Sequence, residues 1–391
     1  MRKIIIASDS FKGSLSSLEV ANAAAKGIKT VFPDCATTCL DIADGGEGTS
    51  STLTKALGGN TESVTVSDPL GRFVTASYGI AETSYGKTAI IEMSQASGLT
   101  LIPPKERNPL LTSTYGTGEM IMDAFNKGCR RFMVGIGGSA TNDGGTGMFE
   151  ALGAIFIDTD GRRMSRMCGG SIGSISRIDT AGIPHGLMES EFIVACDVET
   201  PFCGPEGAAA VVGPQKGATP DMVATLEQGM QHLNRIILQD HGMDLSKVKG
   251  SGAAGGLGGS FKAFLNARLN KGIDMVLEAI GFEEKIQNAD LIITGEGKID
   301  SQTAKGKVIS GITSIARKHD IPVIAIAGIV DMDKDEAREC GLAGIFAIGP
   351  RPQNESDLEY AMRSEVASSN ISETVAKALV SLSPSLFHEN L

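Results

Sequence analysis

Acidic and hydroxyl side chains stand inside several glycine-rich segments of this chain, at 43–49, 137–145 and 294–300. Glycine lets the backbone approach a phosphate closely, and the N–H groups at a helix start favour such an anion. Acidic residues such as Asp44 and Glu296 could contribute to a Mg²⁺ site, because Mg²⁺ is held by one or two carboxylates together with nucleotide phosphates. These residues predict phosphate chemistry on a small molecule.

Single cations and acids in other loops extend this pattern. Lys12 lies in a loop shortly before a helix start, and Lys216 lies in the segment 213–217, so either could neutralise a phosphate or a substrate carboxylate. Asp197 directly follows an apolar run and could orient or deprotonate an accepting hydroxyl. Acidic residues also cap helices and turns, and that interpretation stays open for Asp9 and Asp143.

Several other kinds of site are disfavoured. None of the five histidines lies in a glycine-rich segment, which argues against a histidine-based triad or a histidine-ligated zinc. The chain has no G-x-x-x-x-G-K-[ST] motif. Residues 250–255 fit G-x-G-x-x-G, but they follow a polar segment rather than a strand, so a dinucleotide site is not indicated there.

The elements that must position these residues alternate between strands and helices near both ends of the chain. The pattern predicts strands at 3–7, 36–42, 289–293, 322–327 and 344–348. A capping box of Ser16 and Glu19 marks the first helix, and a last helix is expected over 356–382. This alternation favours a parallel sheet, in which ligands bind beyond the carboxyl ends of the strands.

The middle of the chain lacks the regular alternation of strands and helices seen near the ends. Residues 62–80 read as paired strands around a turn at 68–71, residues 209–212 as a short strand and residues 221–241 as a long helix. We therefore expect a doubly wound α/β domain built from both chain ends, with a second α/β domain inserted. The expected ranges are 1–64, 107–150 and 286–391 for the first domain, and 65–106 and 151–285 for the inserted one.

Composition sets broad limits on function. The chain has 391 residues, which predicts two domains, and its net charge of −11 disfavours nucleic acid as a partner. Seven scattered cysteines without a CxxC pair read as reduced thiols. No apolar stretch approaches the length of a membrane span and no secretory signal is evident, so a cytoplasmic location is expected.

Several of these loops resemble the glycerate kinase type-1 family. The matching stretches run in the family's order across nearly the whole chain, and they are Asp9–Leu15, Ile42–Thr49, Tyr115–Glu119, Gly137–Gly145, Ala195–Val198, Gly213–Ala218, Gly252–Gly258, Thr294–Gly297, Asp300–Thr303 and Gly306–Lys307. Many of them are long and unusual in composition, so a chance match is implausible.

The resemblance implies ATP-dependent phosphorylation of D-glycerate with Mg²⁺, giving 2-phosphoglycerate, with 3-phosphoglycerate as the alternative product. It also implies a flavodoxin-like domain with a second α/β domain inserted and a site in the cleft between them. The small-molecule substrate would be the main partner, and assembly into a homo-oligomer is left open.

Site residues follow from combining the loops with this resemblance. Lys12, Asp44 and Asp197 are the expected catalytic residues, with Asp197 and Asp44 as rivals for the role of base. The residues expected to bind substrate are Ser10, Arg72 and Lys216. The residues expected to bind nucleotide phosphates are Gly138, Ser139, Thr141, Gly255, Gly256 and Glu296. Asp197 and Glu296 are the expected metal ligands.

Two functions of other classes compete with a kinase. A nicotinamide oxidoreductase would carry G-x-G-x-x-G at the first strand–helix turn, where this chain has Ser-Asp-Ser-Phe-Lys-Gly-Ser at 8–14. A non-catalytic sugar-acid sensor would need a DNA-binding or partner module, and the sequence offers no spare basic helix for one.

Overall fold

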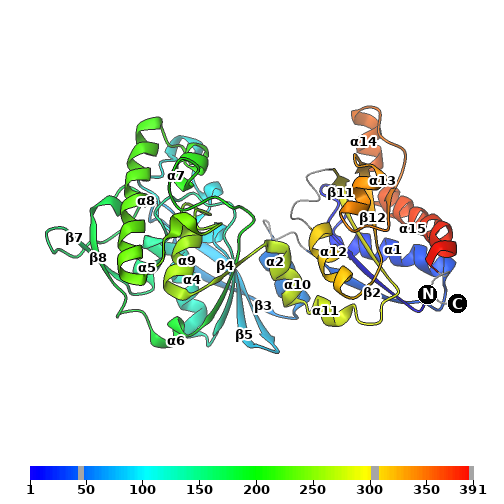
Figure 1. The fold of residues 1–391 in the computed structure, drawn as a ribbon, viewed down its shortest axis with the longest axis horizontal. Helices are drawn as coiled ribbons and strands as arrows, with labels where there is room; N and C mark the ends of the chain where they lie inside the picture. The colour runs from blue at the N-terminus through cyan, green and yellow to red at the C-terminus, as the bar shows by residue number, and fades with distance from the viewer. Residues whose placement is uncertain (43–47, 301–307, 387–391) are drawn as a thin grey trace. The chain divides into compact units, whose positions relative to one another are not determined.

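The computed structural model describes residues 1–42, 48–300 and 308–386 (Figure 1). The chain forms two compact units. Unit 1 comprises Met1–Asp44 and Val276–Leu391, so it is assembled from both ends of the chain, and unit 2 is the continuous segment Gly45–Met275. Each unit has a sheet and a hydrophobic core of its own.

Unit 1 is built on a five-stranded, wholly parallel sheet in the order β13-β12-β11-β1-β2. Its strands are β1 (Lys3–Ser8), β2 (Ala36–Asp41), β11 (Leu291–Ile299), β12 (Val323–Val330) and β13 (Gly344–Ala347). Its helices are α1 (Ser17–Val31), α11 (Phe282–Lys285), α12 (Val308–Lys318), α13 (Lys334–Glu339), α14 (Glu355–Ala361) and α15 (Ser364–Leu386), while α10 (Gly272–Ala279) spans the boundary between the units. Numbered within the sheet, the strand order is 2-1-3-4-5, which is that of flavodoxin-like folds.

Helices cover both faces of this sheet because its strands are apolar on both sides. Ile4 and Ile6 face a core that they share with α1 and α15, and α12 lies on the opposite face (Figure 1). The predicted capping box of Ser16 and Glu19 starts α1. Helices α1 and α15 approach very closely at Gly27, where a Cβ atom would collide with the carbonyl oxygen of Ser372.

Unit 2 is built on a six-stranded mixed sheet in the order β10-β9-β6-β5-β4-β3. A separate two-stranded sheet of β7 and β8 is formed by the chain between β6 and β9. Its strands are β3 (Asn60–Ser67), β4 (Phe73–Thr83), β5 (Gly86–Glu92), β6 (Arg131–Gly135), β7 (Ile155–Asp158), β8 (Ile175–Asp179), β9 (Glu191–Ala195) and β10 (Arg268–Asn270). Its helices are α2 (Thr49–Ala56), α3 (Ser94–Ser97), α4 (Tyr115–Asn126), α5 (Thr146–Ala151), α6 (His185–Met188), α7 (Ala208–Val212), α8 (Pro220–His241) and α9 (Leu257–Leu265).

The core of unit 2 joins the parallel half of its sheet to the surrounding helices. Phe132 on β6 and Phe192 on β9 stack with ring centroids 4.6 Å apart, and Phe261 of α9 lies 5.8 Å from Phe192. The expected hairpin around residues 68–71 is present as β3 and β4. This packing fixes the carboxyl ends of β6 and β9, where two of the candidate loops begin.

The division into units differs from the expected one. Residues 107–150 were placed with the chain ends, but β6 hydrogen-bonds with β5 and β9 in the second sheet. Likewise β3, within the expected range 1–64, pairs with β4. A helix followed by a strand looks the same in sequence whichever sheet the strand joins, so the local pattern could not make this choice.

Two expected elements are also corrected. Residues 209–212 belong to a helix, α7, because the run of three alanines there favours helix over strand. The expected single helix over 356–382 is broken after Met362 into α14 and α15, and Ser364 at the start of α15 hydrogen-bonds to the carbonyl of Ser14. The break lets the chain turn beside the loop that follows β1.

The cysteines and helix lengths agree with the expectations from composition. All seven cysteines are free thiols. Across the described parts of the chain, no helix combines the length and the apolar character that crossing a membrane requires.

Candidate functional site

In unit 1, the loop after β1 is fastened to the neighbouring strand β11. The backbone N–H of Asp9 donates to the carbonyl of Gly295 at 2.9 Å, and the hydroxyl of Ser8 donates to the same carbonyl. The Asp9 carboxylate accepts from the N–H of Ser10 at 2.7 Å, which shapes the turn. These bonds place Lys12 beside the carboxyl-terminal part of β11, which carries Glu296.

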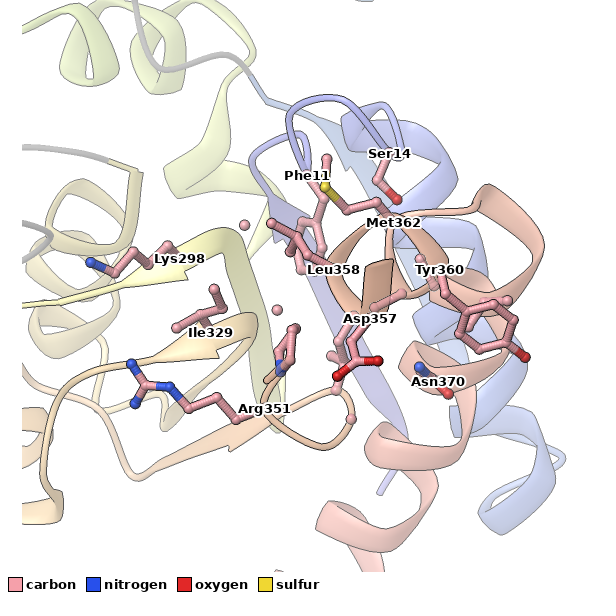
Figure 2. Close-up of a pocket in the computed structure, with 18 of the residues that line it drawn as sticks. Phe11, Ser14, Lys298, Ile329, Arg351, Asp357, Leu358, Tyr360, Met362 and Asn370 are labelled. Atoms are coloured by element: carbon pink, nitrogen blue, oxygen red, sulfur yellow. The ribbon is translucent and has the colours of Figure 1, made fainter. Parts of the chain in front are cut away.

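A cavity of about 970 Å³ opens at this place, and Ser10, Lys12 and Glu296 all line it (Figure 2). It lies beyond the ends of β1 and β13 and along the last residues of β11 and β12. In a sheet of order 2-1-3-4-5 the strand order reverses between β1 and β11, and ligands bind at such a reversal. Three residues that the sequence indicated therefore share one pocket.

In unit 2, the loop after β6 runs deep inside the unit. Gly138 has a φ of 72°, a left-handed conformation that suits glycine. Its carbonyl accepts from Leu99 at 2.9 Å, and the N–H of Ala140 donates to Ser97 at 2.9 Å. These bonds hold Ser139 and Thr141 almost entirely out of solvent, with exposed fractions of 8% and 0%.

Lys216 points into this loop from the short helix Pro214–Lys216. Its ammonium donates to the hydroxyl of Ser139 and to the carbonyl of Thr141, both at 2.6 Å. Burial lowers the pKa of Lys216 to about 7, against a smaller opposing effect of the Asp143 charge. Two of its three N–H donors are thus satisfied within the described residues, and one remains for a ligand.

Further polar groups of the same loop are buried without a hydrogen-bond partner among the described residues. They are the hydroxyl of Thr141 and both the oxygen and the nitrogen of the Asn142 side chain. The Nε of Arg107 is also buried without a hydrogen-bond partner among the described residues. The Arg107 backbone packs against Gly217, which follows Lys216 in the chain. An unsatisfied buried polar group costs about 1–3 kcal/mol, so the three such atoms of Thr141 and Asn142, in the loop that Lys216 contacts, indicate a built site for a polar ligand.

Asp143 has a structural role in this loop. Its carboxylate accepts from the N–H and the hydroxyl of Thr114, and from the N–H groups of Gly145 and Gly147. Burial raises the pKa of Asp143, while these donors act in the opposite direction. It joins the starts of α4 and α5, which agrees with the interpretation of Asp143 as a capping residue.

Comparison with known proteins identifies the relatives of this fold. A sequence model of the glycerate kinase family matches residues 4–382. The chain belongs to the glycerate kinase family. A glycerate kinase from Bacillus subtilis (strain 168) is 47% identical over 348 residues, which cover 89% of this chain and 90% of that protein. The glycerate 2-kinase of Escherichia coli (strain K12) is 44% identical over 346 residues, which cover 88% and 90%.

A solved structure supports the fold of this glycerate kinase family member. The crystal structure of a proposed glycerate kinase 2 from Salmonella typhimurium LT2 superposes with a TM-score of 0.84 at 41% identity. The match covers 98% of this chain and 99% of that one. The resemblance seen in the loops is therefore confirmed, as is the α/β fold class.

Gly255 and Gly256 are explained by close packing. The carbonyl of Gly255 accepts from the N–H of Gly144 at 3.0 Å, and a Cβ atom at Gly255 would collide with the backbone of Thr141. A Cβ at Gly256 would lie 2.8 Å from Phe202. Both glycines thus bring the start of α9 against the polar loop, and phosphate binding by them stays a prediction.

Asp197 lies at the end of β9, as the sequence indicated, and its carboxylate is engaged there. Its Oδ1 accepts from the N–H of Gly272 at 2.8 Å, at the start of α10. This bond fixes the carboxylate at the end of β9. Its catalytic role and its role as a metal ligand stay predictions.

Arg72, an expected substrate-binding residue, forms ion pairs with two protein carboxylates. Its guanidinium donates to Asp68 at 2.7 Å and to Glu106 at 3.0 Å, and its side chain is 49% exposed. The hydrogen bond that Arg72 donates to Asp68 is the main cause that raises the pKa of Arg72. Two protein carboxylates bind Arg72 in this structure, and its role in binding a substrate carboxylate stays a prediction.

The glycine-rich segment at 43–49 lies mostly outside the described residues. Asp44 lies outside the described residues, so its role as a catalytic residue stays a prediction. The helix α2 that follows this loop has its first N–H groups taken by Glu92, which accepts from Ser50 at 2.6 Å and from Gly48 at 3.3 Å. The start of α2 is thus paired with a protein carboxylate.

Sequence reasoning missed Asn142, Arg107 and Glu92. Asn142 lies inside Gly137–Gly145, one of the stretches that match the family, so this hydroxyl- and amide-rich loop was a signal that pointed to it. Arg107 and Glu92 stand in ordinary surroundings in the sequence. Only tertiary burial and contact distinguish them.

Proposed function

We propose that this protein transfers the γ-phosphoryl group of ATP to the 2-hydroxyl of D-glycerate and gives 2-phosphoglycerate. The observation that carries the proposal is the match over nearly the whole chain to a glycerate 2-kinase at 44% identity. The buried cluster around Lys216 supports it, because a small hydroxy acid offers one carboxylate and two hydroxyls to a lysine, a hydroxyl and an amide.

In this proposal the residues of unit 2 hold the acceptor. Lys216 and Arg107 would bind the glycerate carboxylate, and Thr141 and Asn142 would hydrogen-bond its hydroxyls. Asp197 would orient the reacting hydroxyl or accept its proton, with Asp44 as the alternative base. In-line phosphoryl transfer depends mainly on positioning and charge stabilisation, which such a fixed set of donors can supply.

In unit 1, Lys12 would neutralise phosphate charge, and Ser10 would hydrogen-bond beside it. Asp9 and Glu296 line the same cavity, and carboxylate oxygens are the ligands that Mg²⁺ prefers. Among the described residues no group of three or more His, Cys, Asp or Glu could hold a metal alone. One or two carboxylates fit an ion that arrives with a nucleotide, where it neutralises charge on the phosphates.

A coupled ADP-release assay over a panel of small hydroxy acids tests the substrate. We expect turnover with D-glycerate in the presence of ATP and Mg²⁺, and ³¹P NMR of the product should show 2-phosphoglycerate. A 3-phosphoglycerate signal would correct the position of transfer. No turnover with D-glycerate, together with turnover of another acid, would refute the proposed substrate.

Asp197→Asn tests the proposed base. An amide oxygen can still accept from Gly272, so the fold should persist, whereas the proton acceptor is lost. We expect kcat to fall about 10²–10⁴-fold, the usual contribution of general acid–base catalysis, with little change in ATP affinity. Unchanged kcat would leave Asp44 as the candidate.

The other expectations belong to the same proposal. A cytoplasmic location, the lack of a nucleic-acid partner and any homo-oligomer are predictions from composition. The free cysteines and the acidic net charge of −11 support the first two.

A further inference from the structure

The cavity of unit 1 is much larger than glycerate requires. Its volume is about 970 Å³, close to the upper end of the ~300–1,000 Å³ that pockets for drug-sized ligands span. A three-carbon acid would leave most of it filled with water. The cavity lies at the reversal of strand order between β1 and β11, the position where sheets of this order bind nucleotide-sized ligands.

The walls of the cavity divide into an apolar end and a charged end (Figure 2). Phe11, Leu358 and Met362 gather at one end, whereas Lys298 and Arg351 lie at the other. Leu358 is 38% exposed and belongs to α14, a helix with no buried residue. An exposed apolar wall beside two cations is complementary to a molecule with a flat base and an anionic tail.

The two cations share one carboxylate partner. Asp331 lies 3.3 Å from the Lys298 ammonium and 2.9 Å from the Arg351 guanidinium, and Asp300 also contacts Lys298. The Lys298 and Arg351 side chains are 50% and 67% exposed, so solvent and salt screen these ion pairs and leave them weak. A triphosphate carries more charge than one carboxylate and can add to or replace these contacts.

Glu296 gives this end of the cavity a carboxylate. It lies two residues before Lys298 on β11, so the two side chains emerge on the same side of the strand. A nucleotide whose phosphates reach Lys298 would bring its metal-binding oxygens toward Glu296.

We propose that this cavity of unit 1 is the nucleotide site of the enzyme, with the base against Phe11, Leu358 and Met362 and the phosphates at Lys298 and Arg351. The proposal rests on the function proposed above, since it supplies ATP as the donor. In this arrangement the buried loop of Ser139 and Thr141 in unit 2 binds the acceptor, glycerate, rather than the nucleotide phosphates.

Leu358→Glu tests the apolar end, with calorimetric titration of the non-hydrolysable analogue AMP-PNP as the measurement. A carboxylate at this position would lose the apolar contact and would be desolvated against the base, so we expect affinity to fall about tenfold or more. Leu238→Glu is the matched control, because Leu238 is a leucine of similar exposure, 44%, on helix α8 of unit 2. Equal affinity of Leu358→Glu and Leu238→Glu would overturn the proposal.

Arg351→Gln tests the charged end independently. Its side chain is largely exposed, so the fold should tolerate the change. We expect AMP-PNP to bind several-fold more weakly while the affinity of AMP, which has fewer phosphates, changes less. The same loss for AMP and AMP-PNP, or no loss for either, would contradict the proposed orientation.

The failure of this inference is distinguishable from failure of the proposed function. If the wild type phosphorylates D-glycerate and both variants keep wild-type affinity for AMP-PNP, the cavity is not the nucleotide site. If both variants lose affinity but no turnover of D-glycerate is seen with the wild type, the site stands and the substrate is wrong.

Discussion

Lys216 is a nearly fully buried lysine, 2% exposed, whose pKa burial lowers to about 7 from an ordinary value of 10.5. Between these values the unfolded chain binds one more proton than the folded chain, so the stability contributed by this residue rises with pH in that window. Below pH 7 the ammonium is charged in both states and its full burial cost is present. We expect the melting temperature of the wild type to rise, relative to Lys216→Met, between pH 7 and pH 9.

The same titration should appear in substrate binding. Only the protonated ammonium attracts the glycerate carboxylate, so the KM for glycerate of the wild type should increase as pH rises above 7. In Lys216→Met the KM should be high at every pH, with the slope removed. A wild-type KM for glycerate that is flat from pH 6 to pH 9 would contradict a carboxylate contact at Lys216.

Thr141 and Thr112 form a matched pair of wholly buried threonines. The Thr112 hydroxyl donates to the carbonyl of Ala140 at 3.0 Å, whereas the Thr141 hydroxyl has no partner among the residues described. Thr112→Val should lower the free energy of unfolding by about 1–3 kcal/mol, because it leaves a buried carbonyl unsatisfied. Thr141→Val should leave stability unchanged or raise it, and should increase the KM for glycerate.

Calorimetric melting and steady-state kinetics on both threonine variants check this prediction. The two variants are isosteric, so differences between them report hydrogen bonding rather than volume. Equal destabilisation by Thr141→Val and Thr112→Val, with no change of KM in either, would show that Thr141 is only a packing residue.

At this scale the sequence was most informative where a residue follows a strand. Ser10, Lys12 and Glu296 could be predicted to share a pocket, because parallel strands end at the same edge of a sheet. Arg72 illustrates the limit, since its pairing with Glu106 joins residues 34 positions apart in the sequence. The unpartnered state of Asn142 is likewise a property of tertiary burial and leaves no local pattern.

At the scale of the elements, the position of a strand in the sequence was easier to predict than the neighbouring strands with which it pairs. The apolar runs that form β1, β11 and β12 are short and bounded by polar residues, which makes their existence and parallel direction evident. Whether β6 joins β1 or β5 is decided by the packing of Phe132 against Phe192 and by the pairing of whole strands, which no window of sequence contains. The break between α14 and α15 similarly depends on a contact with the loop after β1.

At Gly27 the helices α1 and α15 pack too closely to accommodate a side chain. Gly27→Ala should improve helix propensity by about 0.5–1 kcal/mol, yet its Cβ collides with the backbone of α15. Overpacking of this kind costs about 1–3 kcal/mol, so we expect a net loss of stability. Faster hydrogen exchange of the amides in α1 and α15 is the measurement.

Asn22→Ala controls for helix propensity, because Asn22 is exposed on the same helix. It should slow exchange in α1 slightly or leave it unchanged. If Gly27→Ala behaves like Asn22→Ala, the close approach of α1 and α15 is not needed for the stability of unit 1.

At the scale of the whole molecule, the two units differ in how the chain builds them. Unit 2 is one continuous segment, Gly45–Met275, and contains the buried cluster around Lys216. Unit 1 contains the large cavity and takes β1 and β2 from the N-terminal part of the chain, while β11, β12 and β13 come from the C-terminal part. Each unit therefore contributes one of the two polar centres on which the proposed reaction depends.

The pairing of β1 with β11 has a consequence for synthesis on the ribosome. Ile4 pairs with Leu291, so β1 must wait for nearly three hundred further residues before its neighbour β11 exists, although its other neighbour, β2, follows soon after it in the chain. At about 5–20 residues per second, that delay is roughly 15–60 s. During it β1 can pair with β2 on one edge, while its other edge stays unpaired and the continuous middle segment can already fold. An exposed edge of an apolar strand is prone to mispairing, so the nascent N-terminal segment would gain from a chaperone.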